Sequence, residues 1–252
     1  MNIKKIEGFR RKLKDAKCYG IFSKTTDSGM VEAAGHSGLD FIILDQEHGP
    51  IGQETLHNHV RAADFSPIVS IVRVNGHDYD VIGSALDSGA YGVQVPNIST
   101  SEQARAVVAA AKYHPLGSRG VCRFVRAADY GIRERGEYIA DANRALVVLQ
   151  VEGLEGISNL DTILDVEGFD VLFVGPYDLS QSVGRPGLVD HSEVLELIST
   201  IAEKSRRKGV ALGSFADTPE AQRRQAAMGF THLSYGVDQN LFLQACSEIP
   251  SL

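Results

Sequence analysis

Several features are missing from this chain of 252 residues, and each absence excludes a class of protein. No apolar stretch reaches the roughly 18 residues that a membrane helix needs, and the polar N-terminus lacks the apolar run of a signal peptide. The net charge is −7, and no basic stretch is dense enough for nucleic-acid binding. Tryptophan is absent, so large stacking surfaces are few. We therefore expect a protein that binds neither a membrane nor a nucleic acid.

Cysteine is also scarce. Cys18, Cys122 and Cys246 form no CxxC pair, and an odd number of cysteines makes a poor disulfide framework. This pattern favours reduced thiols in a cytoplasmic protein. The basic residues in 4–17 have a helical pattern, which we interpret as the solvated face of an N-terminal helix.

Short apolar runs rich in β-branched residues recur along the chain and predict eight strands. These are residues 19–23, 41–44, 68–74, 92–95, 145–151, 171–174, 210–213 and 232–235. Several runs are almost continuously apolar, as expected for strands buried on both faces of a parallel sheet. Helical stretches lie between them, among them residues 101–112, 192–208 and 219–228.

The alternation of strands and helices without a linker predicts one α/β domain, residues 1–252, folded as a closed (β/α)8 TIM barrel. An open doubly wound sheet is the structural alternative. No GxGxxG follows the first strand, so a dinucleotide-binding sheet is not supported.

The longest insertion, residues 113–143, is interpreted as a loop that covers the barrel mouth. Its Arg119, Arg123 and Arg126 could together hold an acidic group of a substrate. The alternative is a solvated loop without such a role.

In a barrel of this kind, the catalytic groups lie where the strands end, at the carboxyl-terminal face. Polar residues follow strands two to six in turn, namely Asp45, Gln46, Glu47 and His48, then Arg73, then Gln94 and Asn97, then Gln150 and Glu152, and finally Tyr177 and Asp178. None of these strand ends presents a lysine for Schiff-base chemistry. Carboxylates, a histidine and an arginine therefore converge on one rim, which is the main functional signal.

Glu152 and Asp178 follow successive strands, so their carboxylates can meet at the barrel mouth. Two carboxylates supply hard oxygen ligands, which suit Mg²⁺ or Mn²⁺ better than a metal that prefers thiolate. The alternative is that each carboxylate caps a helix or pairs with a basic side chain.

His48 stands beside Asp45 and Glu47 and is a candidate general base near neutral pH. The alternative is a rim histidine that is hydrogen-bonded for structural reasons. His57 and His59 lie two residues apart in a predicted helix, so they share no face, and both are interpreted as surface residues.

Arg73 ends an apolar strand, where a buried guanidinium is costly unless it is paired. It could stabilise an oxyanion or hold a carboxylate through two hydrogen bonds. The alternative is a salt bridge inside the barrel with Asp45 or Asp87.

In these residues the chain resembles the HpcH/HpaI aldolases, the metal-dependent class II pyruvate aldolases that include 4-hydroxy-2-oxoheptanedioate and 2-dehydro-3-deoxyglucarate aldolases. The motifs that carry the resemblance are Asp-Gln-Glu-His at 45–48, Val-Arg at 72–73, Gly-Ser-Arg-Gly-Val at 117–121, Gln-Val-Glu at 150–152, Gly-Pro-Tyr-Asp-Leu-Ser at 175–180 and Gly-Val-Asp at 236–238. They run in order over nearly the whole chain. Each is moderately specific alone, and together in register they are strong.

The resemblance implies that Glu152 and Asp178 bind a divalent metal ion, Mg²⁺, Mn²⁺ or Co²⁺, which chelates pyruvate through its carboxylate and keto oxygens. Gln150 and the backbone near Tyr177 would also touch this substrate. The partners would be a small 2-oxo acid and an aldehyde.

The resemblance also implies that His48 is the base, with Asp87 raising its basicity. Arg73 would stabilise charge on the enolate oxygen, and Asp45 and Glu47 would orient metal-bound water. Removal of a methyl proton from a 2-oxo acid leaves an enolate, and positive charge at its oxygen stabilises it as it forms. The enolate then adds to an aldehyde, and the reverse reaction cleaves a 4-hydroxy-2-oxo acid.

Two positions depart from the family pattern. Gln46 stands where Gly is common, and Tyr177 stands where Ala is common. Both add bulk near the substrate and leave the acceptor aldehyde open.

Other functions remain as alternatives to the aldolase. One is an oxaloacetate decarboxylase that uses the same enolate. Another is a citrate lyase-like enzyme that cleaves a coenzyme A thioester, although no coenzyme-binding signature is present. A third is a noncatalytic barrel that binds a 2-oxo acid. The resemblance further implies a homohexamer, a trimer of dimers with exchanged C-terminal helices, and the apolar residues 241–245 are compatible with it.

Overall fold

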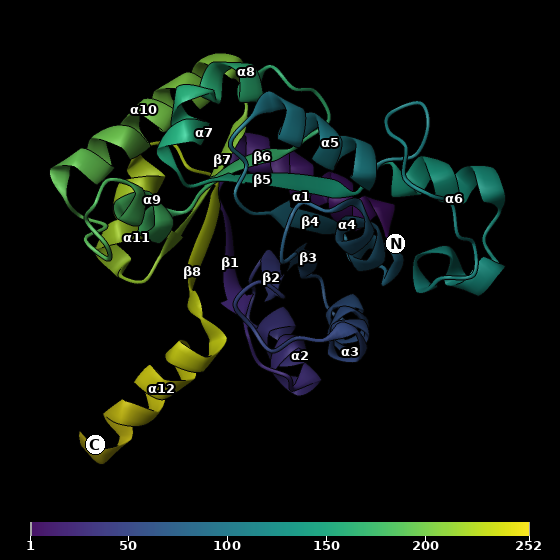
Figure 1. Cartoon of the computed structure of the whole chain (residues 1–252). Coiled ribbons are helices and arrows are strands. Elements are labelled where there is room, and N and C mark those ends of the chain that lie inside the picture. Colours follow the sequence, from purple (N-terminus) through teal and green to yellow (C-terminus); the bar gives the residue numbers. More distant parts are fainter. Residues whose placement is uncertain (1, 252) are drawn as a thin grey trace.

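The computed structural model, which describes residues 2–251, contains eight parallel strands that close into a barrel in chain order (Figure 1). The strands are β1 (Cys18–Ser23), β2 (Phe41–Asp45), β3 (Val69–Arg73), β4 (Gly92–Val95), β5 (Leu146–Val151), β6 (Val171–Val174), β7 (Ala211–Ala216) and β8 (His232–Val237). The predicted (β/α)8 barrel is confirmed. β7 extends beyond the predicted apolar run because the pairing of Ala216 with Tyr235 continues its ladder with β8, and β8 extends further because Val237 pairs with Phe22 of β1.

Of the helices, one precedes the first strand, and the others follow the strands and mostly surround the barrel. They are α1 (Ile3–Asp15), α2 (Ser28–His36), α3 (Gln53–Asp64), α4 (Tyr79–Asp87), α5 (Ser101–Ala111), α6 (Arg135–Ala142), α7 (Leu154–Ser158), α8 (Leu160–Leu164), α9 (Pro176–Ser182), α10 (Ser192–Lys208), α11 (Pro219–Ala227) and α12 (Asp238–Glu248). Two 3₁₀ helices, η1 (Arg126–Gly131) and η2 (Ile249–Ser251), complete the set. Within residues 2–251, no helix is both long enough and apolar enough to cross a membrane.

Local sequence signals explain several helix ends. Thr100 and Gln103 form a capping box at the start of α5, and the Thr218 hydroxyl accepts a hydrogen bond from the Ala221 N–H at the start of α11. Gly209 ends α10 with a φ of 69°, a left-handed conformation that favours glycine.

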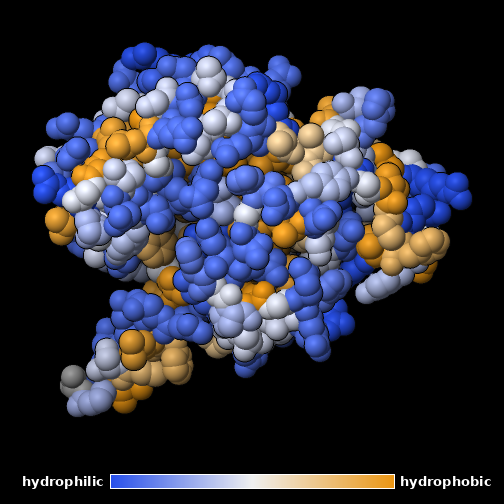
Figure 2. All heavy atoms as spheres, viewed as in Figure 1, coloured by the Kyte–Doolittle hydropathy of each residue, from blue (hydrophilic) through white to orange (hydrophobic). Residues whose placement is uncertain are grey.

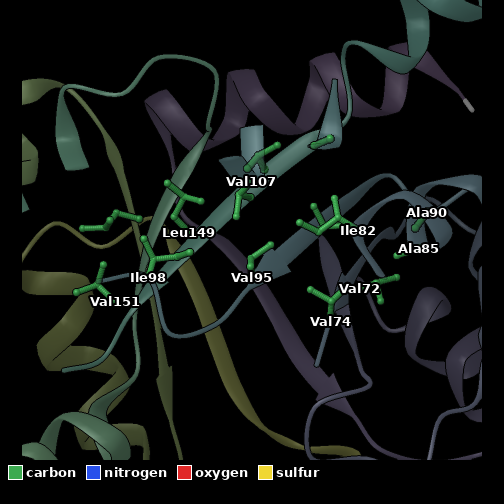
Figure 3. Packing of buried hydrophobic residues seen from close by; sticks show 14 of the residues in the cluster. Val72, Val74, Ile82, Ala85, Ala90, Val95, Ile98, Val107, Leu149 and Val151 are labelled. Carbon is green, nitrogen blue, oxygen red and sulfur yellow. The ribbon is translucent and has the colours of Figure 1, made fainter. Parts of the chain in front are cut away.

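The core consists of two apolar layers separated by the strands. The outer layer fills the space between strands and helices and includes Val72, Val95 and Leu149 (Figure 3). The inner layer fills the barrel and continues onto α1, whose Ile6, Phe9 and Leu13 are buried. Strand residues alternate between the two layers and nearly all of them are withdrawn from solvent, which explains the apolar runs. Tyr19 of β1 is the exposed exception among them.

The predicted N-terminal helix is α1. Its apolar side is buried, while basic residues such as Arg11 and Lys14 are exposed. The helix therefore covers the amino-terminal end of the barrel and leaves the carboxyl-terminal end open for a site.

The interpretation of residues 113–143 as a mouth-covering loop is wrong. This segment connects the end of α5 to the start of β5, so it lies at the amino-terminal end of the barrel, opposite the mouth. Arg126 donates a hydrogen bond to the Ser88 carbonyl just beyond α4, and the segment buries its own small cluster around Tyr113 and Tyr138. The length of an insertion does not reveal on which end of the barrel it lies.

Helix α12 projects away from the barrel (Figure 1). Its only buried residue is Asp238, while Phe242 and Leu243 are 62% and 64% exposed. In Figure 2 apolar residues are visible on this projecting segment. Helix α12, which follows the eighth strand, therefore leaves an apolar surface uncovered in the single chain.

Inside the barrel, His232 is fully buried and stacks on Phe41, with 3.8 Å between ring centroids. Neither ring nitrogen has a hydrogen-bond partner among the described residues. Burial lowers the pKa of His232 to about 3, because a charged imidazole is poorly solvated there. The unfolded chain, with an ordinary histidine pKa near 6.5, therefore takes up a proton that the folded chain does not.

We expect His232→Phe to raise the free energy of unfolding by about 1–3 kcal/mol, because it removes unpaired polar atoms from the barrel. The gain should grow as the pH falls below about 6.5, where protonation favours the unfolded wild type. Urea titrations between pH 8 and pH 5 measure both effects. The control is His77→Phe, at an exposed histidine, which should change the free energy of unfolding little at pH 8. Equal pH profiles for wild type and His232→Phe would contradict the neutral, buried imidazole.

Candidate active site

A cavity of about 320 Å³ opens at the carboxyl-terminal end of the barrel. Its lining includes Phe22, Lys24, His48, Arg73, Gln150, Phe173, Gly175, Tyr177, Asp178 and Phe215. The volume is at the lower end for small-molecule sites. Five predicted site residues, His48, Arg73, Gln150, Tyr177 and Asp178, therefore share one cavity.

Arg73 and Asp45 form a buried ion pair at adjoining strand ends. The Arg73 Nε and Nη2 atoms donate to the two Asp45 carboxylate oxygens over 2.8 and 2.7 Å. Burial by itself would raise the pKa of Asp45, but the hydrogen bonds and charge of Arg73 outweigh it and lower that pKa. Asp45 also accepts hydrogen bonds from the backbone N–H groups of Glu47 and His48. It thus orients Arg73 and shapes the turn that carries His48.

Arg73 also contacts Glu47, with 3.2 Å between Nη1 and Oε2. Burial raises the pKa of Glu47 even though the Arg73 charge opposes the shift. The His48 ring is more than half exposed, and its Nε2 lies 3.9 Å from the same Glu47 oxygen. The His48 ring is thus accessible from the cavity, and the carboxylate of Glu47 lies close to it.

Glu152 is buried at the end of β5 and held by two hydrogen bonds. The Asn97 N–H donates to Oε1 over 2.9 Å, and the Gln150 side-chain amide donates to Oε2 over 2.5 Å. The Gln94 side-chain amide in turn donates to the side-chain oxygen Oε1 of Gln150 over 2.5 Å. This chain of amides runs inside the barrel and fixes the direction of the carboxylate.

The pKa of Glu152 is raised to about 7, first because of burial and further because of the Asp178 and Glu47 charges. Asp178 lies in the first turn of α9, which begins with Pro176. Gly175 connects β6 to this helix, and a Cβ atom at that position would lie 2.5 Å from Glu152 Oε2. The glycine therefore leaves room for the carboxylate beside Asp178.

These residues fit a divalent cation. Within residues 2–251, neither Glu152 nor Asp178 has a lysine or arginine partner within 4.0 Å, whereas Asp45 and Glu47 have Arg73. Two carboxylates that repel one another, one of them buried, suit a hard metal ion that takes oxygen ligands. No group of three His, Cys, Asp or Glu side chains in the described part of the chain forms a complete metal site. Water or substrate oxygens would have to complete the coordination.

Tyr177 forms one wall of the cavity. Its hydroxyl donates to Asp217 beyond β7, and its ring lies 6.2 Å from that of Phe215. Gln46 does not add bulk there, contrary to expectation, because its side-chain amide turns back and donates to the Ile51 carbonyl over 3.1 Å. Of the two departures from the family pattern, only Tyr177 lines the cavity.

Asp87 does not join the group within one chain. It ends α4 and pairs with Arg119 in a separate groove that Arg126 also lines. Arg123 donates to the backbone carbonyls of Gly131 and Arg133. These three arginines therefore hold the 113–143 segment in place, and none of them lines the cavity at the mouth.

His59 is not a surface residue, as the sequence suggested, but is fully buried. Its Nε2–H donates to the Thr25 carbonyl over 2.9 Å, and its Nδ1 lies 3.2 Å from the Ser28 hydroxyl. His57 is exposed, as predicted. The spacing of the two histidines correctly placed them on different faces, but did not reveal that one face packs against the turn after β1.

Sequence reasoning missed Lys24, which directly follows β1 and lines the cavity. The first strand end thus does present a lysine, and its position after a strand is the signal that identified the other residues. Asp238 was identified only as part of the Gly-Val-Asp motif at 236–238 and was given no role. Its buried carboxylate accepts hydrogen bonds from the Ser23 hydroxyl and from the Lys24 and Thr25 N–H groups.

Residues 18–245 match the family described as HpcH/HpaI aldolase/citrate lyase. The chain belongs to this family. The resemblance predicted from the strand-end motifs is confirmed over most of the chain. As a member of the HpcH/HpaI family, the protein is an aldolase, a carbon–carbon lyase, and class II aldolases of this family generally depend on a divalent metal ion.

Individual relatives agree with this assignment. A 2-keto-3-deoxy-L-rhamnonate aldolase from Salmonella gallinarum is 38% identical over 230 residues, which cover 90% of this chain and 85% of the relative. The crystal structure of an HpcH/HpaI aldolase/citrate lyase family protein from Burkholderia cenocepacia J2315 superposes with a TM-score of 0.92 at 29% identity, covering 97% of this chain and 98% of the other. The citrate synthase SbnG has a TM-score of 0.86, also at 29% identity, over 96% of this chain and 95% of its own.

We expect Arg73→Met to lower the free energy of unfolding by about 3 kcal/mol, because it leaves Asp45 charged and buried without its main partner. The double variant Arg73→Met/Asp45→Asn removes that charge and should recover about 1 kcal/mol or more. Urea unfolding at one protein concentration measures both. Equal stability of the single and double variants would contradict the ion pair.

Proposed function

We propose that this aldolase cleaves or forms 4-hydroxy-2-oxo acids through an enolate of pyruvate. The observation that supports the proposal most strongly is the shared cavity of His48, Arg73 and Asp178, with Glu152 buried beside Asp178. Glu152 and Asp178 would hold Mg²⁺, Mn²⁺ or Co²⁺. When bound, the metal ion supplies positive charge that stabilises an enolate oxygen.

The protein groups divide the remaining work. His48 is exposed to the cavity and is the group we propose to remove the methyl proton of pyruvate and to return a proton to the acceptor oxygen. Arg73, held rigidly by Asp45, stabilises negative charge on the substrate. Gln150 would position Glu152 and contact pyruvate, and Tyr177 would contact it from the wall.

The substrate class follows from chemistry shared with the rhamnonate aldolase relative. A 2-keto-3-deoxy acid has a carbonyl carbon next to a methylene group, so cleavage beyond the methylene group releases pyruvate. Oxaloacetate decarboxylation is a second candidate for the same cavity because it also passes through a pyruvate enolate. The citrate synthase SbnG, which has a similar structure, supports the view that this fold carries more than one reaction.

Asp87 has a role in this proposal only across a subunit contact, because within one chain it pairs with Arg119 away from His48. We propose that the protein forms a homohexamer in which subunits exchange α12. The exposed Phe242 and Leu243 support the exchange because an isolated apolar helix surface is unfavourable in water.

The enolate step predicts that the methyl protons of pyruvate exchange with solvent deuterium when Mg²⁺, Mn²⁺ or Co²⁺ is added, and that EDTA abolishes the exchange. Proton NMR of pyruvate measures this rate without any aldehyde. His48→Ala should slow exchange by about 100-fold or more and leave metal affinity nearly intact. Glu152→Gln should weaken metal binding, measured by calorimetry. Absence of exchange with every metal would refute the mechanism, and equal metal loss in both variants would refute the division of roles.

The exchanged helix predicts a single species of six subunits by light scattering coupled to size exclusion. Phe242→Glu combined with Leu243→Glu should shift the mass to smaller assemblies, because two charges would be buried in an apolar contact. The matched control is Phe65→Glu, which alters another exposed aromatic residue, 83% exposed at the end of α3. A monomeric wild type would refute the assembly.

A further inference from the structure

We infer that Lys24 selects acceptor aldehydes that carry an anionic group, a carboxylate or a phosphate, at the end away from the carbonyl. The inference rests on the proposed function, because it names the second substrate of the same cavity. It follows from where Lys24 lies, how its backbone is held and what its ammonium group contacts.

The backbone of Lys24 is fixed from two sides. Its N–H donates to the Asp238 carboxylate over 3.1 Å, and the neighbouring Thr25 N–H donates to the same group over 3.2 Å. The Thr25 carbonyl accepts a hydrogen bond from the buried His59. The turn after β1 is thus tied to the start of α12 and to α3. The side chain extends from a fixed point into the cavity.

The ammonium group of Lys24 is only weakly engaged. Its Nζ lies 3.5 Å from Asp45 Oδ2, which is too long for a strong hydrogen bond. Asp45 already accepts two hydrogen bonds from Arg73 and two from backbone N–H groups. No other ion pair of Lys24 is present within residues 2–251. Its three donors are therefore available to a ligand.

Lys24 lies on the His48 side of the cavity. The turn that carries His48 packs against it, since a Cβ atom at Gly49 would lie 3.5 Å from the Lys24 Cα. β1 pairs with β2 and β8, whereas Glu152 follows β5 and Asp178 follows β6. Pyruvate is assigned to the carboxylate side, so the acceptor must approach from the side of His48 and Lys24.

A lysine at this position favours a charged acceptor over a neutral one. A neutral aldehyde displaces water from the ammonium group but forms no ionic hydrogen bond in its place. A carboxylate or a phosphate displaces the same water and forms one or more such bonds. The lysine ammonium group is a point charge on a flexible side chain, so it can donate hydrogen bonds to a carboxylate or to a phosphate. The two parallel hydrogen bonds that an arginine can donate are already used by Arg73 to bind Asp45.

The test compares pairs of aldehydes that differ in the anionic group, with pyruvate as the donor. Succinic semialdehyde is paired with butanal, and glyceraldehyde 3-phosphate is paired with glyceraldehyde. The quantity measured is the ratio of kcat/KM values within each pair for one enzyme. This ratio cancels any effect on the pyruvate step, because both aldehydes meet the same enolate.

For wild type we expect a ratio above one for at least one pair, and the preferred pair identifies carboxylate or phosphate as the anion. Lys24→Met should lower that ratio about tenfold, mainly through KM of the anionic aldehyde, and Lys24→Arg should restore part of it. The control is Lys204→Met, a lysine that pairs with Asp161 on the outer surface, and it should leave the ratio unchanged. A ratio of one or below for both wild-type pairs, or equal losses with charged and neutral aldehydes in Lys24→Met, would overturn the inference.

A binding measurement separates this inference from the proposed function. Succinate titrated into the EDTA-treated full-length protein should bind about tenfold more weakly to Lys24→Met than to wild type or Lys204→Met. Unchanged affinity, or no measurable binding to wild type, overturns the role of Lys24 even if methyl exchange proceeds. Weakened binding supports it even if methyl exchange is absent and the proposed reaction is wrong.

Discussion

The ion pair between Asp45 and Arg73 is the interaction on which the site depends. It joins the ends of two neighbouring strands, and both partners are withdrawn from solvent. A guanidinium at the base of a cavity would otherwise be costly, and it would be free to turn toward Glu152 or Asp178. With Asp45 and Glu47 holding Arg73, neither Glu152 nor Asp178 has a lysine or arginine within 4.0 Å in the described residues 2–251. The separation of charge across the cavity is therefore built into the barrel.

Much of the fold could be predicted because a barrel imposes a strong pattern on its strands. Strand residues are buried on both faces, so apolar runs such as residues 171–174 mark strands clearly. Strand ends were also informative, since parallel strands bring residues as distant in sequence as His48 and Asp178 to one cavity. The end of the barrel on which a residue lies follows from its place in the strand–helix order.

The predictions failed where side-chain partners outside the strand pattern decide the outcome. The 113–143 segment follows a helix rather than a strand, and its arginines bind groups such as Asp87 and Asp64 that local sequence does not identify. His59 is buried because the turn after β1 supplies partners from far along the chain. The direction of the Gln46 side chain depends on a single carbonyl five residues away. These are tertiary contacts, and the spacing of residues in the sequence does not predict them.

Asp238 lies where the last helix and the turn after β1 meet. This residue begins α12, the helix that leaves the barrel, and its carboxylate also holds the backbone of the turn that carries Lys24. The start of the projecting helix and the turn that positions Lys24 are therefore held by the same buried carboxylate. Loss of this carboxylate would loosen the base of α12 and the backbone of Lys24 together.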